Sequence, residues 1–163
     1  MKKVIVLSRV STEGQDLTQQ TDEVLREVYK DGYTDSNIII IEDKESAIQL
    51  SEEERHGLNK MKEYISTNPN INCVYIYELS RLSRIPLVLY SIRDYLVERR
   101  IQLICLKPYF RLLEVDGTMS QTGSLMFSLF SSLAESEMIL KKERMMRGRR
   151  RNKELGRSVG GRP

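Results

Sequence analysis

The chain has 163 residues, of which 40% are hydrophobic and 30% charged, and it contains no Trp. This length suits one domain with a real core, and the composition excludes a disordered or membrane-spanning protein. The net charge of +3 is small, but it is unevenly distributed along the chain. The longest apolar runs are strand-sized and nothing resembles a signal peptide, so we expect a cytoplasmic protein that does not enter a membrane.

A strand, a helix and a second strand are predicted first. Residues 3–7 form a β-branched run that ends in a polar cluster, which is typical of a buried strand followed by a functional loop. Helical spacing of apolar residues begins at Asp16, and Gly32 suits the end of that helix. Residues 37–41 form the second strand. The polar stretch 42–50 is predicted to be a mobile loop.

The middle of the chain repeats this alternation. Ser51 followed by Glu54 is a capping-box pattern that opens a helix, and the Asn-Pro-Asn sequence at 68–70 ends it. A third strand is predicted at 73–79, a polar loop or turn at 80–84, a helix from Pro86 to Arg100, and a fourth strand at 101–106. Strands that alternate with helices predict an α/β fold with a mostly parallel sheet of about four to five strands and helices on both faces.

Residues 121–153 contain no Pro and are predicted to form one long helix after an α/β core of residues 1–120. The first half of this helix is apolar over a wide arc, either because it packs on its own core or because it also buries a partner subunit. We favour the second interpretation, which predicts an oligomer interface at Met126, Phe130 and Leu133.

The second half of that helix is strongly basic. Residues 141–163 hold ten Lys and Arg against two Glu, a net charge of +8, whereas the first 140 residues carry 16 basic and 21 acidic residues, a net of −5. A solvated charged face is the usual explanation of a charge run, but so few anions leave little internal pairing. We therefore predict contact with nucleic acid, carried by residues Lys142, Arg144, Arg147, Arg149 and Arg151. Residues 154–163 have a linker's composition.

The candidate chemistry begins in the loop after the first strand, where Ser11 follows Arg9. The hydroxyl is expected at the carboxyl edge of the sheet, where ligands bind in such folds. The alternative is that Ser11 or Thr12 only caps the next helix. The same helix start would attract a phosphate.

Arginines are expected to gather at this edge. Arg81 and Arg84 follow the third strand and would share a face if their turn is helical. Together with Arg9 and Arg55 they give four guanidinium groups near a hydroxyl, and guanidinium forks match the oxygens of a phosphate. The sequence has one His and no Gly-rich phosphate-binding motif, which argues against a Ser-His-Asp triad and nucleotide binding. Cys73 and Cys105 are expected to be core residues, with no metal site.

These residues resemble the serine recombinases, the resolvases, invertases and related integrases. The segment 9–12 with Gln15 and Gln20 is similar to the family's nucleophile motif, and Ser11 falls on the nucleophile. Arg55 falls on the second arginine, and Arg81 and Arg84 on the pair after the third strand. Residues 134–144 resemble the family's long helix, and 156–163 its linker, so the resemblance implies a helix-turn-helix DNA-binding domain that we expect to lie outside this chain. The chain departs from the family at Ser80, where many members carry Asp, and at the Leu7-Ser8 pair, where a Tyr is common.

The resemblance implies site-specific DNA recombination through a covalent 5′-phosphoserine intermediate. Ser11 would attack the phosphate, the four arginines would stabilise it, and Gln15 and Gln20 would hold the serine or phosphate oxygens. It further implies double-stranded DNA and other copies of the chain as partners, as a dimer and an active tetramer, with no cofactor and no small-molecule substrate. The alternative is a DNA-binding or assembly module of the same fold that does not cleave DNA.

Overall fold

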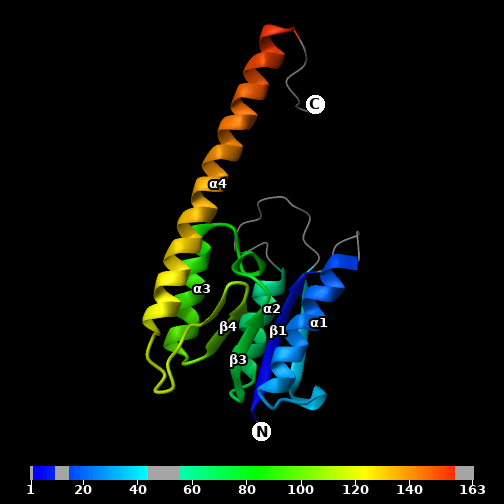
Figure 1. Ribbon diagram of the computed structural model, residues 1–163, viewed down its shortest axis with the longest axis vertical. Helices are drawn as coiled ribbons and strands as arrows, with labels where there is room; N and C mark the ends of the chain where they lie inside the picture. The colour runs from blue at the N-terminus through cyan, green and yellow to red at the C-terminus, as the bar shows by residue number, and fades with distance from the viewer. Residues whose placement is uncertain (1, 10–14, 44–55, 157–163) are drawn as a thin grey trace.

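The computed structural model describes residues 2–9, 15–43 and 56–156. A five-stranded sheet lies at its centre in the order β2-β1-β3-β4-β5 (Figure 1). Its strands are β1 (Lys3–Arg9), β2 (Ile38–Asp43), β3 (Ile71–Ile76), β4 (Gln102–Leu106) and β5 (Tyr109–Arg111). The first four run parallel and β5 is antiparallel to β4, which confirms the predicted α/β fold.

Helices cover both faces of the sheet, as the alternation along β1 requires. Val4 and Val6 pack in one cluster with Val24 and Val28 of α1 (Gln15–Lys30). Ile5 and Leu7 point to the opposite face, into a larger cluster. That cluster contains buried side chains of α2 (His56–Thr67), α3 (Pro86–Glu98) and α4 (Gln121–Glu154). The alternating apolar side chains of β1 therefore contribute to two separate cores.

All four predicted strands differ from the structure at one end or both, most of all β2 and β3. Glu42 and Asp43 belong to β2, in register with Ser8 and Arg9 of β1, although their polarity suggested a loop. The prediction of a strand over 73–79 was wrong at both ends, since β3 covers Ile71–Ile76. Leu79 lies in the 3-10 helix η3 (Leu79–Arg81), where its buried side chain anchors a turn. A buried residue in a turn is apolar just as a buried strand residue is, so the apolar pattern alone does not distinguish the two.

The helix α4 is anchored only at its beginning. Ser120 caps it by accepting a hydrogen bond from the Gly123 amide, and Phe127 packs edge-on against Phe110 of β5. Beyond Ser131 no described residue of α4 is buried. The remaining 23 residues, 132–154, extend about 35 Å at 1.5 Å per residue. Figure 1 shows this part standing clear of the sheet and its covering helices.

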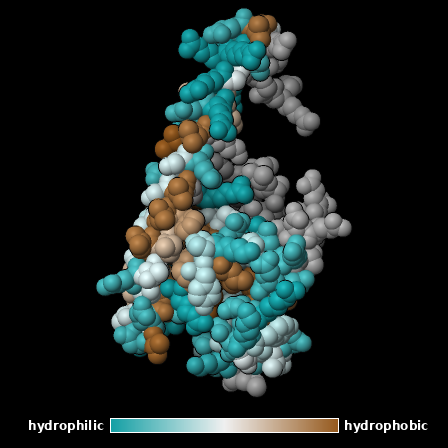
Figure 2. All heavy atoms as spheres, viewed as in Figure 1, coloured by the Kyte–Doolittle hydropathy of each residue, from teal (hydrophilic) through white to brown (hydrophobic). Residues whose placement is uncertain are grey.

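Apolar side chains remain exposed along the first half of α4 (Figure 2). Leu125, Leu129 and Leu133 follow one another at four-residue spacing and lie about half or more exposed. Met126 and Phe130 instead pack, partly buried, against the protein's own core. Within the described ranges, no helix has both the length and the hydropathy needed to cross a membrane.

Candidate active site at the carboxyl edge of the sheet

The elements that carry the candidate residues meet at the carboxyl edge of the sheet. β1 and β3 are parallel neighbours, with Leu7 in register with Ile76, so the chain leaves both strands on the same side. β1 ends at Arg9, and β3 leads through Tyr77 and Glu78 into η3. The topology therefore brings the segment around residue 80 to the place where the chain continues from Arg9 toward Ser11.

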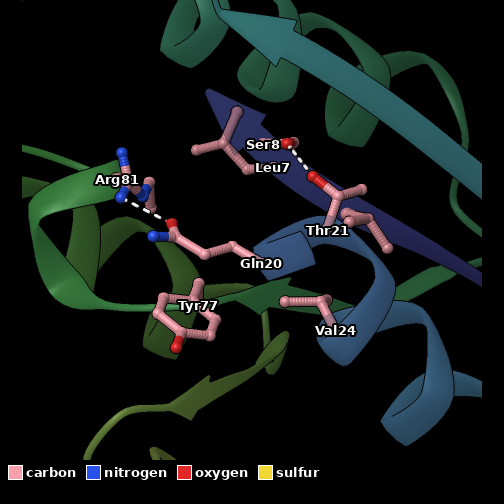
Figure 3. A pocket seen from close by; sticks show the side chains of 8 residues that line it. Leu7, Ser8, Gln20, Thr21, Val24, Tyr77 and Arg81 are labelled. Carbon is pink, nitrogen blue, oxygen red and sulfur yellow. Dashed lines mark hydrogen bonds between the residues drawn. The ribbon is translucent and has the colours of Figure 1, made fainter. Parts of the chain in front are cut away.

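Arg81 and Gln20 come together at this edge, although 61 residues separate them in the chain. Arg81 donates a hydrogen bond from Nη2 to Gln20 Oε1 at 2.7 Å. Its side chain is only 9% exposed. Figure 3 shows the two side chains pointing toward each other from η3 and α1. A guanidinium that is mostly removed from water and held by an amide keeps its orientation, as an anion-binding group should.

A carboxylate that we did not predict lies beside Arg81. Glu78 Oε1 is 2.9 Å from Arg81 Nη2, and it accepts a hydrogen bond from Ser80 Oγ at 2.6 Å. The Arg81 amide also donates to the Glu78 carbonyl at 3.0 Å, so the two residues close one turn. Only the three-residue spacing of Glu78 and Arg81, common to many surface pairs, could have pointed to this contact.

A small hollow lies beneath Arg81 and Gln20, between β1 and α1 (Figure 3). Ser8, Thr21 and Tyr77 line it together with apolar side chains of both elements. Ser8 is buried, and its hydroxyl shares a short hydrogen bond with the Thr21 hydroxyl. Ser8 thus connects β1 to α1 one residue before Arg9.

Arg84 has different surroundings from Arg81. The 3-10 helix ends at Arg81, so the helical turn that would place both arginines on one face does not reach Arg84. Ser83 is buried and its Oγ accepts from the Ile85 amide, while Arg84 is exposed. The two arginines therefore share the edge of the sheet but not a common packed face.

Several candidate residues lie wholly or partly outside the described residues. Ser11 and Arg55 are among those not described, and so are the predicted loop from residue 44 and the capping box at Ser51. Arg9 and Gln15 are described as the last residue of β1 and the first of α1, without their side chains. The catalytic roles of these residues stay predictions.

The two cysteines are buried core residues, as expected. Burial raises the pKa of the Cys105 thiol to about 12, although Cys105 donates to two carbonyls. Burial also raises the pKa of Cys73. Both thiols stay protonated near neutral pH, so neither is a nucleophile there. Within the described ranges, no three His, Cys, Asp or Glu side chains gather as metal ligands would.

The predicted DNA-contacting residues are all exposed on the free part of α4: Lys142, Arg144, Arg147, Arg149 and Arg151. Arg147 pairs with Glu143, and the neighbouring Arg150 pairs with Glu154. Of the predicted interface residues, Leu133 is half-exposed. The DNA contact and the interface remain predictions.

Comparison with known proteins gives a consistent result. The family described as "Resolvase, N terminal domain" matches residues 4–158. The crystal structure of the N-terminal catalytic domain of TP901-1 integrase superposes with a TM-score of 0.58 at 26% identity, covering 85% of this chain and 98% of that one. A resolvase family site-specific recombinase from Streptococcus pneumoniae gives a TM-score of 0.57 at 26% identity, covering 94% and 99%. No curated protein matches the chain.

The chain covers 98% and 99% of these two solved structures, so the similarity extends over nearly their whole length. The family match extends from the first strand to beyond the end of α4. It includes every candidate residue from Arg9 to Arg151. The chain therefore belongs to the resolvase N-terminal domain family.

Proposed function

We propose that this chain is the catalytic domain of a site-specific DNA recombinase in which Ser11 is the nucleophile. Its family and the two similar solved structures named above, an integrase catalytic domain and a site-specific recombinase, support the general activity. The observation that carries the assignment of the site is the contact between Gln20 and Arg81. Both residues were candidates for phosphate binding, and they meet at the edge where β1 leads to Ser11.

The proposed reaction is a phosphoryl transfer. Ser11 Oγ attacks a DNA phosphorus in line, an Oγ–P bond forms, and the bond from phosphorus to the 3′ oxygen breaks. The serine loses its proton, the 3′ oxygen gains one, and a 5′-phosphoserine link with a free 3′-hydroxyl results. Because the link replaces one phosphodiester with another, a 3′-hydroxyl of an exchanged strand can reverse the step without a cofactor.

The arginines supply the electrostatic part of this reaction. Negative charge accumulates on the oxygens of the pentacoordinate phosphorus, and fixed cations stabilise it more than mobile water does. Arg81 is suited to this role because its position is set by Gln20 and Glu78 before any DNA binds. Arg9, Arg55 and Arg84 are proposed to complete the cluster, and Gln15 to hold the serine or a phosphate oxygen.

Double-stranded DNA and further copies of the chain are the proposed partners. The exposed cations of α4 would contact DNA phosphates. The exposed leucines at positions 125, 129 and 133 give the same helix an apolar surface that a second copy could bury, to which Met126 and Phe130 could add their exposed parts. Strand exchange would then take place between subunits of a tetramer.

Covalent attachment to DNA tests the proposal. The chain is incubated with supercoiled plasmid, the reaction is stopped with detergent, and protein bound to DNA ends is measured. Ser11→Ala should abolish the adduct, while the loss of one capping hydroxyl should cost at most about 1–2 kcal/mol of stability. Ser66→Ala, at an exposed hydroxyl of α2, is the matched control and should behave as the unsubstituted chain.

An adduct that persists in Ser11→Ala would exclude Ser11 as the nucleophile. DNA binding without any adduct from the unsubstituted chain would favour a non-cleaving DNA-binding or assembly module of the same fold.

A further inference from the structure

Arg81 requires a fixed negative charge close by. Its side chain is 9% exposed, and a cation removed from water is costly unless an anion or several hydrogen bonds compensate it. Glu78 provides the charge at 2.9 Å and Gln20 provides a neutral acceptor at 2.7 Å. Both contacts use Nη2, so they fix this nitrogen from the η3 side and from the α1 side.

The Glu78 carboxylate is itself held in place. Ser80 Oγ donates to Oε1, the same oxygen that contacts Arg81. The backbone bond from the Arg81 amide to the Glu78 carbonyl closes the turn, and the buried Leu79 and Leu82 anchor it in the core. The carboxylate, the hydroxyl and the guanidinium therefore form one unit within four consecutive residues.

This arrangement explains the departure at Ser80. Many recombinases carry Asp at this position, whereas a serine hydroxyl has no charge to offer. In this chain the hydroxyl instead donates to a carboxylate that originates two residues earlier. The negative charge next to Arg81 therefore comes from position 78, two residues before the position at which the family resemblance implies an Asp.

We propose that Glu78 is a positioning residue of the recombination site, which holds the Arg81 guanidinium in place for the scissile phosphate while Ser80 orients the Glu78 carboxylate. This inference rests on the proposed function. Glu78 acts through Arg81 and is 41% exposed, so its role is orientation and charge balance and not the stability of the core.

The test uses two variants: the first removes the negative charge of Glu78, and the second also adds a negative charge at position 80. Glu78→Gln keeps the size of the side chain and an oxygen that can accept from Ser80, but it removes the charge. We expect adduct formation with supercoiled plasmid to slow roughly 10- to 100-fold, because small errors in the position of a reacting group have effects of this size. DNA affinity should remain unchanged, and the midpoint of thermal unfolding should fall only slightly, because an amide at this position can still accept from Arg81 and the Glu78 side chain is 41% exposed.

The double substitution Glu78→Gln with Ser80→Asp returns the carboxylate to the position where it is common in the family. It should recover adduct formation to within about threefold of the unsubstituted chain, as expected when one charge replaces another beside the same guanidinium. Glu98→Gln, at a side chain of α3 that is 74% exposed, is the matched control and should have no effect.

Three outcomes are decisive. Undiminished adduct formation by Glu78→Gln would overturn the positioning role. A slow single variant that Ser80→Asp does not rescue would overturn the relocation of the charge. If the unsubstituted chain itself forms no adduct, the proposed function fails. This result can be told apart from the other two, because both of those require an active unsubstituted chain.

Discussion

Gly123 is the residue through which α4 approaches the sheet most closely. A Cβ atom added there would lie 2.6 Å from the Arg111 carbonyl oxygen and 3.0 Å from Leu112 Cα. Both are backbone atoms, which cannot move aside as a flexible side chain can. The absence of a side chain at this position therefore lets the first turn of α4 dock beside β5 and sets the direction in which the helix leaves the core.

Gly123→Ala should destabilise the fold, although alanine is the better helix former by about 1 kcal/mol. The clash with two backbone atoms outweighs that gain, and we expect the free energy of unfolding to fall by about 1–3 kcal/mol, as for other overpacked sites. Urea unfolding followed by circular dichroism measures the change. Gly148→Ala, where an added Cβ meets nothing within 4 Å, is the control and should lose no stability. Equal stability of the two variants would contradict the close contact.

Individual site residues differed in how far the sequence could predict them. The family resemblance grouped Gln20 with Arg81, and their side chains are in contact, while their roles stay predictions. Glu78 was missed because its role depends on the direction of a side chain in a turn, which has no periodicity to read. The family pattern places a carboxylate at residue 80 and therefore does not point to the one at position 78.

Three polar contacts join α1 and the residue that follows it to β3 and to the β4–β5 side of the sheet. Glu23 pairs with Lys107, just after β4, at 2.9 Å. At the end of the helix, Asp31 accepts from the Tyr75 hydroxyl at 2.6 Å and pairs with Arg111 of β5 at 3.1 Å. Burial is the main reason that the pKa of Tyr75 is raised, so its hydroxyl remains a donor to Asp31. These contacts fix the helix that carries Gln20.

Asp31→Ala should lower the free energy of unfolding by about 1–2 kcal/mol, because it leaves the Tyr75 hydroxyl without this acceptor. Glu27→Ala is the control on the same helix. Glu27 pairs with the exposed Lys30 one turn away, a contact worth below about 0.5 kcal/mol. Denaturant unfolding of both variants measures the difference, and losses of equal size would show that Asp31 has no special part in docking α1.

Elements were predicted well where their periodicity was long. The helix predicted at 121–153 corresponds to α4, which ends one residue later, and α3 begins at Pro86 as predicted. β5 was not identified as a separate strand, because three residues with exposed ends carry too little alternation. It forms through pairing with β4, with Phe110 as its buried residue. Tertiary contacts and not local pattern decide such short strands.

The two parts of the molecule, the α/β body and the projecting half of α4, carry opposite net charges. The α/β body is mildly acidic, and the part of α4 that extends beyond it is basic. The sequence indicates both the long helix and its extension beyond the core, because the apolar stripe ends before the basic half, and no described side chain of α4 beyond Ser131 is buried. An acidic body would repel DNA phosphates over most of its surface, so the geometry favours an encounter along the helix.

The salt dependence of DNA binding tests this division of charge. Arg144, Arg149 and Arg151 are exposed on the projecting helix and form no ion pair within the described part of the chain. If each contacts a phosphate, binding releases counterions, and the slope of log affinity against log salt should become less steep by about 0.9 for each arginine replaced with Gln. Affinity for duplexes of unrelated sequence should fall in parallel, since phosphate contacts do not read bases.

Fluorescence anisotropy at salt concentrations from about 50 to 200 mM measures the slope of log affinity against log salt. The control replaces the same number of exposed cations on the body, Lys2, Lys60 and Arg99, with Gln. Both triple variants lower the net charge equally, so a general attraction between the protein and DNA would weaken equally in both. Only direct contact along α4 gives a flatter slope in the helix variant alone, and identical slopes for the two variants would exclude α4 as the DNA-contacting element.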